Sequence, residues 1–170
     1  DVDIIYYLPA IFKQDDVNSF KMMFEINTLN VLKLINTLRS RDIGCSLLFP
    51  STRLVYGSSE SRQAEDALLN PISDYAITKY LTESLIQNEL SNSSKIKYFI
   101  LRIGVVYSGF DAPYENTGTL KFMKQSLTEK GYIYLYGDGS LKRTFTNVED
   151  VCSVLLQLGR GAYPSGIYNC

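Results

Sequence analysis

The feature that most constrains the fold of this chain is the alternation of short apolar runs with longer amphipathic segments. The short runs are rich in β-forming residues and lack clean two-residue alternation, which is typical of strands buried on both faces of a sheet. The longer segments repeat apolar residues at helical spacing. Strands that alternate with helices predict βαβ units, a parallel sheet and right-handed crossovers, so we expect an α/β fold. The predicted strands are Val2–Leu8, Cys45–Phe49, Ile96–Val106, Tyr132–Tyr136 and Gly166–Asn169, and the predicted helices are Asn18–Arg39, Tyr75–Leu90, Leu120–Glu129 and Asn147–Leu158.

Composition excludes several classes of function. The chain has 170 residues, 45% of them hydrophobic and 21% charged, which suits one globular domain or part of a larger one. A net charge of −1 gives no electrostatic support for binding nucleic acid or an anionic membrane. The sequence has no His, which excludes Ser-His-Asp hydrolysis and most zinc catalysis. Cys45, Cys152 and Cys170 are an odd number at scattered spacings, so we expect reduced thiols, no metal site and a cytoplasmic protein.

Tyr75 and Lys79 are the candidate acid–base pair of the chain. They are four residues apart in a predicted helix, so they share one helical face. An ammonium beside a phenol favours the phenolate, and we therefore expect Lys79 to lower the pKa of Tyr75 from its ordinary value of about 10. Such a phenol could act as a general acid and base. The alternative is coincidence, because a chain with 13 Tyr should contain roughly one Tyr-x-x-x-Lys pattern by chance.

Small and hydroxyl-bearing residues follow two of the predicted strands. In parallel α/β sheets the chemistry lies beyond the carboxyl ends of the strands. Ser51 and Thr52 follow the second predicted strand, where their hydroxyls could donate to a substrate oxygen or to the tyrosine. The alternative for this pair is an ordinary Ser/Thr turn. Pro9 and Ala10 follow the first predicted strand, and such small residues would let a flat ligand approach the backbone. The alternative is that they only end the strand and have no binding role.

Five motifs occur in order along almost the whole chain: Ser51-Thr52-x-x-Val55-Tyr56-Gly57, Pro71-x-Ser73-x-Tyr75-x-x-x-Lys79, Leu101-Arg102-x-x-x-Val106-Tyr107, Tyr136-Gly137-Asp138-Gly139-Ser140-x-x-Arg143-x-Phe145-x-x-Val148-x-Asp150-Val151 and Ile167-Tyr168-Asn169. Together they resemble the extended short-chain dehydrogenase/reductase superfamily, and within it the NAD-dependent epimerase/dehydratases that act on nucleotide sugars. Asp3–Ala10 is similar to the fourth strand of that family. Asn27 falls where the family's helix carries an asparagine that orders the active-site region.

The resemblance implies a Rossmann-like sheet, NAD or NADP as cofactor, and an epimerase or reductase that transfers a hydride to or from a nucleotide sugar. It implies that Tyr75 exchanges a proton with a sugar hydroxyl and that Lys79 lowers the pKa of Tyr75 and holds the nicotinamide ribose. It also implies that Thr52 donates a hydrogen bond to the reacting oxygen. The candidate cofactor-binding residues are Pro9, Ala10, Ser51, Tyr75 and Lys79, and the candidate substrate-binding residues are Thr52 and Arg143.

Arg143 is expected to bind the pyrophosphate of a nucleotide sugar, since a guanidinium fork suits phosphate. The alternative is a surface ion pair with Glu149 or Asp150. Asp150 is otherwise expected to position its loop rather than to take part in the chemistry.

The sequence also departs from the family pattern. It contains no G-x-G-x-x-G, the turn that holds the cofactor pyrophosphate. We therefore expect a fragment that begins at the family's fourth strand, lacks part of the substrate domain and binds NAD weakly or not at all by itself. Arg53 and Leu54 stand where several 4,6-dehydratases carry acidic residues, which disfavours a dehydratase. Val105 stands where many epimerases carry an asparagine, which leaves the identity of the nucleotide sugar undetermined.

We expect residues 1–107 to form the catalytic portion of an NAD(P)-binding domain, residues 108–146 part of a substrate-binding region, and residues 147–170 a final helix and strand. The family often dimerises through two helices per subunit, which would be Asn18–Arg39 and Tyr75–Leu90 in a homodimer of this chain. The same apolar faces could instead pack on the sheet. Two other functions stay open: an extended dehydrogenase that acts on a non-sugar substrate, and a non-catalytic relative that serves as a binding or assembly module.

Overall fold

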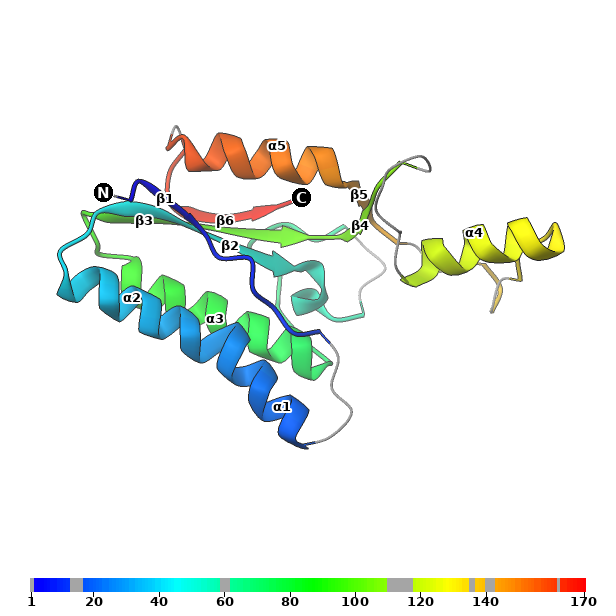
Figure 1. The fold of residues 1–170 in the computed structure, drawn as a ribbon, viewed down its shortest axis with the longest axis horizontal. Helices are drawn as coiled ribbons and strands as arrows, with labels where there is room; N and C mark the ends of the chain where they lie inside the picture. Colours follow the sequence, from blue (N-terminus) through cyan, green and yellow to red (C-terminus); the bar gives the residue numbers. More distant parts are fainter. Residues whose placement is uncertain are drawn as a thin grey trace.

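The centre of the molecule is a four-stranded parallel sheet with the strand order β1-β2-β3-β6 (Figure 1). The structure is a computed structural model that describes residues 2–12, 17–58, 62–109, 118–134, 137–139, 143–161 and 163–170. The four strands are β1 Ile4–Tyr6, β2 Cys45–Thr52, β3 Ile96–Ile103 and β6 Gly166–Asn169. The parallel sheet with helical crossovers confirms the α/β fold that the sequence predicts.

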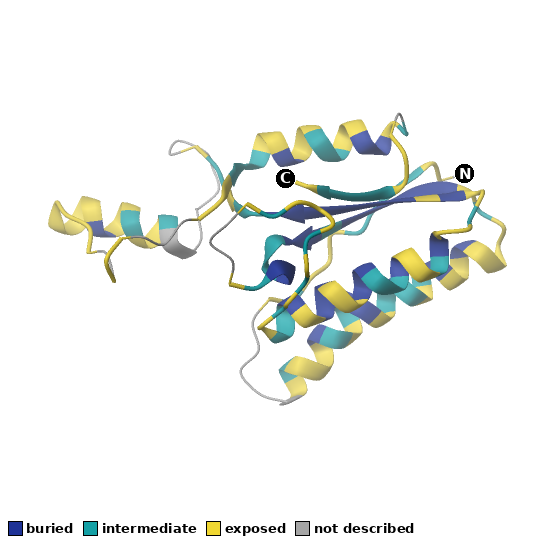
Figure 2. Cartoon of the chain, turned by 180° about the vertical axis from the view of Figure 1, so that it is seen from behind, coloured by how far each residue is buried: buried dark blue, intermediate teal, exposed yellow. Residues whose placement is uncertain are grey.

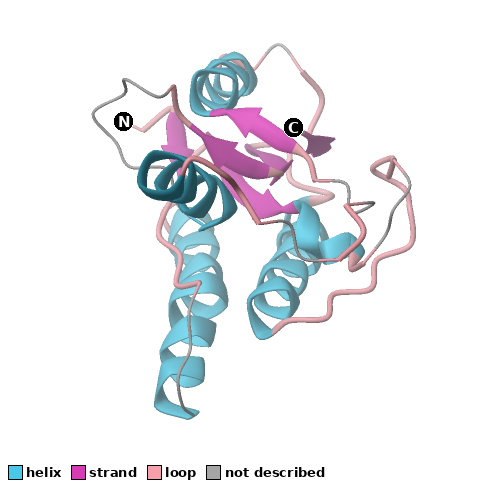
Figure 3. Cartoon of the chain, turned by 90° about the vertical axis from the view of Figure 1, so that its right-hand side faces the viewer, coloured by secondary structure: helices cyan, strands magenta, loops and turns pink. Residues whose placement is uncertain are grey.

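Helices cover both faces of this sheet (Figures 1 and 3). On one face lie α1 (Val17–Phe24), the π-helical turn η1 (Glu25–Leu29), α2 (Asn30–Ser40) and α3 (Asp74–Leu90). On the other face lies α5 (Val148–Gly159). The central strands are therefore covered on both sides and are the most deeply buried part of the chain (Figure 2).

Strand β2 shows why the sequence lacks strict alternation. Leu47 and Phe49 pack in the core formed with α2 and α3, whereas Leu48 packs in the core formed with α5. All three side chains are fully buried. A strand between two helical layers must be apolar on both faces, so its sequence reads as a continuous apolar run.

The predicted strand Ile96–Val106 is wrong as a single element. It breaks at Gly104 into β3 and a short strand β4 (Val105–Tyr107), which pairs with β5 (Phe145–Asn147) in a separate two-stranded sheet. The N–H of Val105 donates to the carbonyl of Thr144 at 2.9 Å. A Cβ atom at Gly104 would lie 3.0 Å from that carbonyl oxygen, so glycine permits the close backbone approach.

The predicted strand Tyr132–Tyr136 is wrong for residues 132–134, which form no strand. These residues are exposed, and the rings of Tyr132 and Tyr134 meet edge to face with centroids 5.0 Å apart. β-forming residues become a strand only where another strand pairs with them, and the described part of the chain offers none here. Leu135 and Tyr136 of the predicted strand lie outside the described residues, as does Ser140 of the motif that follows it.

The remaining predicted helices and strands agree with the structure in outline. Helix α4 (Gly118–Lys130) covers the predicted Leu120–Glu129 and lies at one end of the molecule, away from the sheet (Figure 1). The three cysteines are free, as predicted. Across the described residues, every helix falls short of the length and apolar character that crossing a membrane requires.

Candidate active site

Helix α3 places Tyr75 and Lys79 one turn apart at the carboxyl end of β2. Ser73 has extended backbone angles, and its hydroxyl oxygen accepts a hydrogen bond of 3.2 Å from the N–H of Ala76. This N-cap starts the helix at Asp74, so Tyr75 falls in the first turn. Tyr75 and Lys79 therefore lie four residues apart in one helix and share a helical face, as the sequence predicts.

Lys79 is buried between the end of β2 and the tyrosine ring. Its Nζ donates to the carbonyl oxygen of Pro50 at 2.7 Å and lies 4.3 Å from the ring centroid of Phe49. The same atom lies 5.9 Å from the ring centroid of Tyr75. Burial lowers the pKa of Lys79 to about 8, and the nearby carboxylate of Glu83 partly opposes that change. The ammonium is thus held at the strand end by a carbonyl and two aromatic faces.

Tyr75 is partly buried, and its ring packs edge to face on Phe12 with centroids 4.9 Å apart. Burial raises the pKa of Tyr75 above its ordinary value. The sequence predicts the opposite direction, because it places the ammonium of Lys79 beside the phenol. In this structure that ammonium lies near the edge of cation–π range and bonds to a backbone carbonyl, so desolvation of the phenol prevails.

Ser51 and Thr52 are the last two residues of β2, which continues three residues beyond its predicted end at Phe49. Both are buried. The Thr52 hydroxyl oxygen accepts a hydrogen bond of 3.2 Å from the N–H of Leu54 and so caps the 3₁₀ turn η2 (Arg53–Tyr56). A hydroxyl that accepts can still donate its proton to another group. Ser51 donates its hydroxyl to the carboxylate of Glu83.

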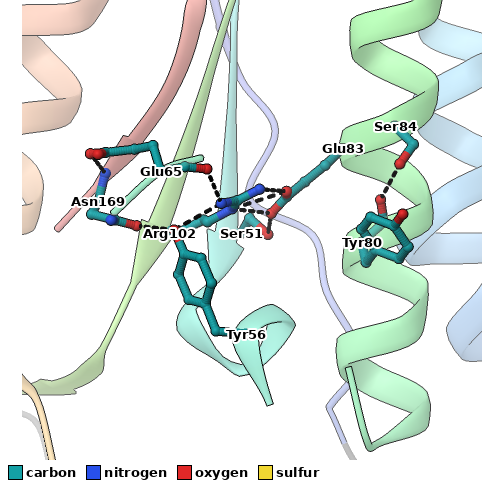
Figure 4. Close-up of polar contacts among 8 residues, drawn as sticks. All are labelled: Ser51, Tyr56, Glu65, Tyr80, Glu83, Ser84, Arg102 and Asn169. Atoms are coloured by element: carbon teal, nitrogen blue, oxygen red, sulfur yellow. Dashed lines mark hydrogen bonds and ion pairs between the residues drawn. The ribbon is translucent and has the colours of Figure 1, made fainter. Parts of the chain in front are cut away.

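A buried ion pair between Glu83 on α3 and Arg102 on β3 lies behind this strand end (Figure 4). The Nη2 and Nε atoms of Arg102 donate to the Oε2 of Glu83 at 2.8 and 3.1 Å. Nη1 donates to the hydroxyl of Tyr56 at 2.8 Å and to the backbone carbonyl of Glu65 at 2.9 Å. Tyr56 in turn donates to the Oδ1 of Asn169 at 2.7 Å.

The sequence reasoning assigned no role to this pair. A signal for it exists, because Arg102 interrupts an apolar strand and a charged residue buried in a sheet needs a partner. Glu83 follows Lys79 by four residues and therefore points from the same helical face. The sequence does not show that the two residues meet across the layers.

Asn27 lies in the π-helical turn η1 and is fully buried. Its Oδ1 accepts from the N–H of Ile11 at 2.8 Å, and its Nδ2 donates to the Ile11 carbonyl at 2.9 Å and to the Thr78 hydroxyl at 3.1 Å. One amide therefore joins the segment that carries Phe12 to the helix that carries Tyr75. This arrangement agrees with the ordering role that the resemblance implies for Asn27.

The other predicted site residues lie on the surface. Pro9 and Ala10 are exposed beyond the carboxyl end of β1, which pairs in parallel with β2. Arg143 is exposed just before β5. Among the described residues, Arg143 forms no ion pair with Glu149 or Asp150.

The fold agrees with the comparison to known proteins. A model described as the NAD dependent epimerase/dehydratase family matches residues 1–170. The chain belongs to this family. A relative from Bacillus subtilis, described as an uncharacterized UDP-glucose epimerase, is 30% identical over 151 residues, covering 88% of this chain and 46% of the relative. A putative UDP-glucose 4-epimerase from Methanocaldococcus jannaschii is 28% identical over 160 residues, covering 92% of this chain and 52% of the relative.

A solved structure has the same fold. The UDP-glucuronic acid 4-epimerase from Bacillus cereus, in complex with UDP-glucuronic acid and NAD, has a TM-score of 0.79 and is 24% identical. The match covers 98% of this chain and 53% of that one. This chain thus spans about half the length of the curated relatives it matches.

Proposed function

We propose that this protein takes part in the epimerisation or reduction of a nucleotide sugar with NAD or NADP, and that Tyr75, Lys79 and Thr52 supply its acid–base chemistry. The observation that carries the proposal is the position of Lys79. Its ammonium is buried between the Pro50 carbonyl and the Tyr75 ring at the carboxyl end of β2, in a chain of the NAD dependent epimerase/dehydratase family. In α/β sheets this edge is where ligands bind.

The relatives support a UDP-sugar as the substrate class. Two of them are described as UDP-glucose epimerases, one as uncharacterized and one as putative, and the solved neighbour holds UDP-glucuronic acid and NAD. Pro9 and Ala10 are small, exposed residues beyond the end of β1, which fits the approach of a flat cofactor, since β1 and β2 are parallel and end at the same edge of the sheet. A bound nicotinamide would accept and return the hydride.

The side chains of this chain would handle the proton and orient the sugar. With its pKa raised, Tyr75 is a protonated phenol at neutral pH, ready to return a proton to a substrate oxygen. In the opposite half of the cycle the phenolate would be stabilised by the Lys79 ammonium. Thr52 would donate a hydrogen bond to the same oxygen, and Arg143 would bind the pyrophosphate.

The test is the substitution Tyr75→Phe in the protein as its gene encodes it, with Tyr80→Phe as the matched control on the same helix. We expect Tyr75→Phe to lower turnover of the UDP-sugar by about 10² to 10⁴, the range for loss of an acid–base group, and to leave binding of the UDP-sugar intact. Conversion is followed by nicotinamide absorbance and by NMR of the sugar. Equal turnover in the two variants would reject an acid–base role for Tyr75 and favour a binding or assembly module.

Arg143→Ala separates the nucleotide-sugar proposal from a dehydrogenase that acts on a small neutral substrate. Loss of a phosphate-binding guanidinium should weaken binding of UDP and of a UDP-sugar alike, as measured by calorimetry. If Arg143→Ala leaves UDP binding unchanged, the pyrophosphate is bound elsewhere.

A further inference from the structure

Three ionisable side chains are buried together behind the proposed site, and the proposed function uses only one of them. Lys79 is 2% exposed, Glu83 1% and Arg102 2%. Removing charges from water is unfavourable, so such a group is retained only with close partners. The cluster holds two cations and one carboxylate. The carboxylate is therefore the group that supplies opposite charge to both cations.

We propose that the Glu83–Arg102 pair is the positioning unit of the active site, which fixes the ammonium of Lys79 and the Ser51–Thr52 end of β2 relative to each other. The inference rests on the proposed function, because the acid–base role of Tyr75 and Lys79 gives this arrangement its purpose. Neither residue of the pair needs to touch the substrate.

On the helix side, the carboxylate of Glu83 joins the two elements that carry the candidate acid–base residues. Glu83 follows Lys79 by one turn on the buried face of α3, and it accepts the hydroxyl of Ser51 at the end of β2. Arg102 reaches both oxygens of the carboxylate through Nε, at 3.3 and 3.1 Å, and one of them through Nη2 at 2.8 Å. A slide or rotation of α3 against β2 would break these bonds together.

On the other side, Arg102 fixes the segment that follows Thr52. Its Nη1 bonds to the hydroxyl of Tyr56 and to the carbonyl of Glu65 (Figure 4). The side chain of Glu65 accepts the backbone N–H of Asn169 at 2.8 Å. The turn after Thr52, the loop that precedes α3 and the end of β6 are thereby tied to the same guanidinium.

The pair also sets the electrostatic surroundings of Lys79. The titratable groups of the network are Tyr75 and Glu83 on its own helix, Arg102 on β3 and Tyr56 in η2, while β2 carries no charged side chain. Glu83 is the one carboxylate among these groups, and its charge opposes the effect of burial on the pKa of Lys79. Without it, burial would lower the pKa of Lys79 further, so a smaller fraction of the amine would carry the charge that stabilises a phenolate.

The experiment is an NMR titration of isotope-labelled lysine side chains in the 170-residue chain, with Lys79→Met used to assign the signal. We expect Glu83→Gln to lower the titration midpoint of Lys79 by at least about one pH unit, as loss of a nearby opposite charge does. Glu89→Gln is the matched control, because Glu89 lies on the same helix and pairs with Arg39 at the surface. This control should leave the midpoint unchanged.

A folded Glu83→Gln chain with the parental midpoint would overturn the inference and reduce the pair to a structural contact. If the single variant does not fold, Glu83→Gln/Arg102→Met removes both charges and leaves no unpaired guanidinium. The midpoint of Lys79 should fall in this variant too, but by less than in Glu83→Gln, because loss of the Arg102 cation partly offsets loss of the Glu83 charge. A midpoint that does not fall would equally overturn the inference. Neither result depends on turnover, so failure of the proposed function in the Tyr75→Phe test is detected separately.

Discussion

The charged form of Lys79 is less favourable in the folded chain than in water. Burial lowers its pKa to about 8 from the ordinary 10.5, because the Pro50 carbonyl and the aromatic rings replace only part of its hydration. An amine with these surroundings can change its charge near physiological pH, which is a property of acid–base sites. The same burial makes Lys79 a source of pH-dependent stability.

We predict that the stability contributed by Lys79 rises with pH. Between about pH 8 and 10.5 the unfolded chain binds this proton and the folded chain releases it, so the free energy of unfolding increases by up to about 1.4 kcal/mol per pH unit. Urea unfolding of the parent and of Lys79→Met over this window isolates the effect, because opposing contributions from Cys45 and Tyr75 cancel in the difference. Parallel pH curves for the two proteins would contradict the prediction.

The Arg102–Glu83 pair predicts a second effect at the scale of single residues. Arg102→Met leaves the Glu83 carboxylate buried without its partner and should lower the free energy of unfolding by about 3–5 kcal/mol. Lys95→Met is the control, because the Lys95–Asp42 pair is exposed and its loss should change stability by less than about 1 kcal/mol. Chemical denaturation measures both, and similar losses in the two variants would show that burial of the pair is unimportant.

Sequence reasoning located one half of the candidate site and missed the other half for a physical reason. Tyr75 and Lys79 are four residues apart on one helix, so their shared face follows from helical geometry. Glu83 and Arg102 meet only because α3 packs across β2 onto β3, and that packing is decided by the apolar residues around them. The direction of the Tyr75 pKa change was mispredicted for the same reason, since desolvation depends on packing.

At the scale of elements, the helical segment before β2 is irregular, and its apolar periodicity does not indicate this irregularity. The sequence predicts one helix over Asn18–Arg39, whereas the structure inserts the π-helical turn η1 between α1 and α2. This turn directs the polar residues Asn27 and Thr28 into the interior, where each finds a hydrogen-bond partner on α3. π-helical turns of this kind occur frequently at functional sites.

We predict that Asn27→Leu frees the segment that carries Phe12. The amide of Asn27 satisfies both backbone groups of Ile11, so its loss should speed hydrogen exchange at Ile11 and lower stability by about 1–3 kcal/mol. Asn27→Asp is the matched control, because its carboxylate still accepts the Ile11 N–H. We expect slower exchange at Ile11 in the Asp variant than in the Leu variant, and equal exchange would show that another contact holds the segment.

The break at Gly104 shows a further limit of prediction at this scale. Ile96–Val106 is one apolar run, but its last part pairs with residues about 40 positions later in the chain. Local propensity cannot reveal that partner, since strand pairing is a tertiary interaction. By contrast, β2 and α3 were located well, because one is a buried run and the other begins with the Ser73 cap.

At the scale of the whole molecule, the helical layer that contains α1 and α3 exposes several apolar side chains. On the α1–α3 side, Met22 is 51% exposed and Ile77 45%, and Tyr80 and Leu81 beside them are also partly exposed. α1 and α3 pack against one another, so these side chains belong to one layer. Apolar side chains gathered on one helical layer are typical of a surface that another subunit covers.

We therefore predict that the chain forms a homodimer through the α1–α3 layer. Ile77→Glu would place a charge in that interface and should shift the protein toward the monomer in sedimentation velocity. Leu156→Glu is the matched control, because Leu156 is 54% exposed on α5, which covers the opposite face of the sheet, and it should leave the dimer intact (Figure 1). A parent chain that sediments as a monomer at every concentration, or a Leu156→Glu variant that dissociates while Ile77→Glu does not, would place the interface elsewhere. The α1–α3 layer also carries Asn27 and Tyr75, so a partner on it would support the helix that holds the proposed acid–base pair. The dimer should therefore resist urea better than the Ile77→Glu monomer.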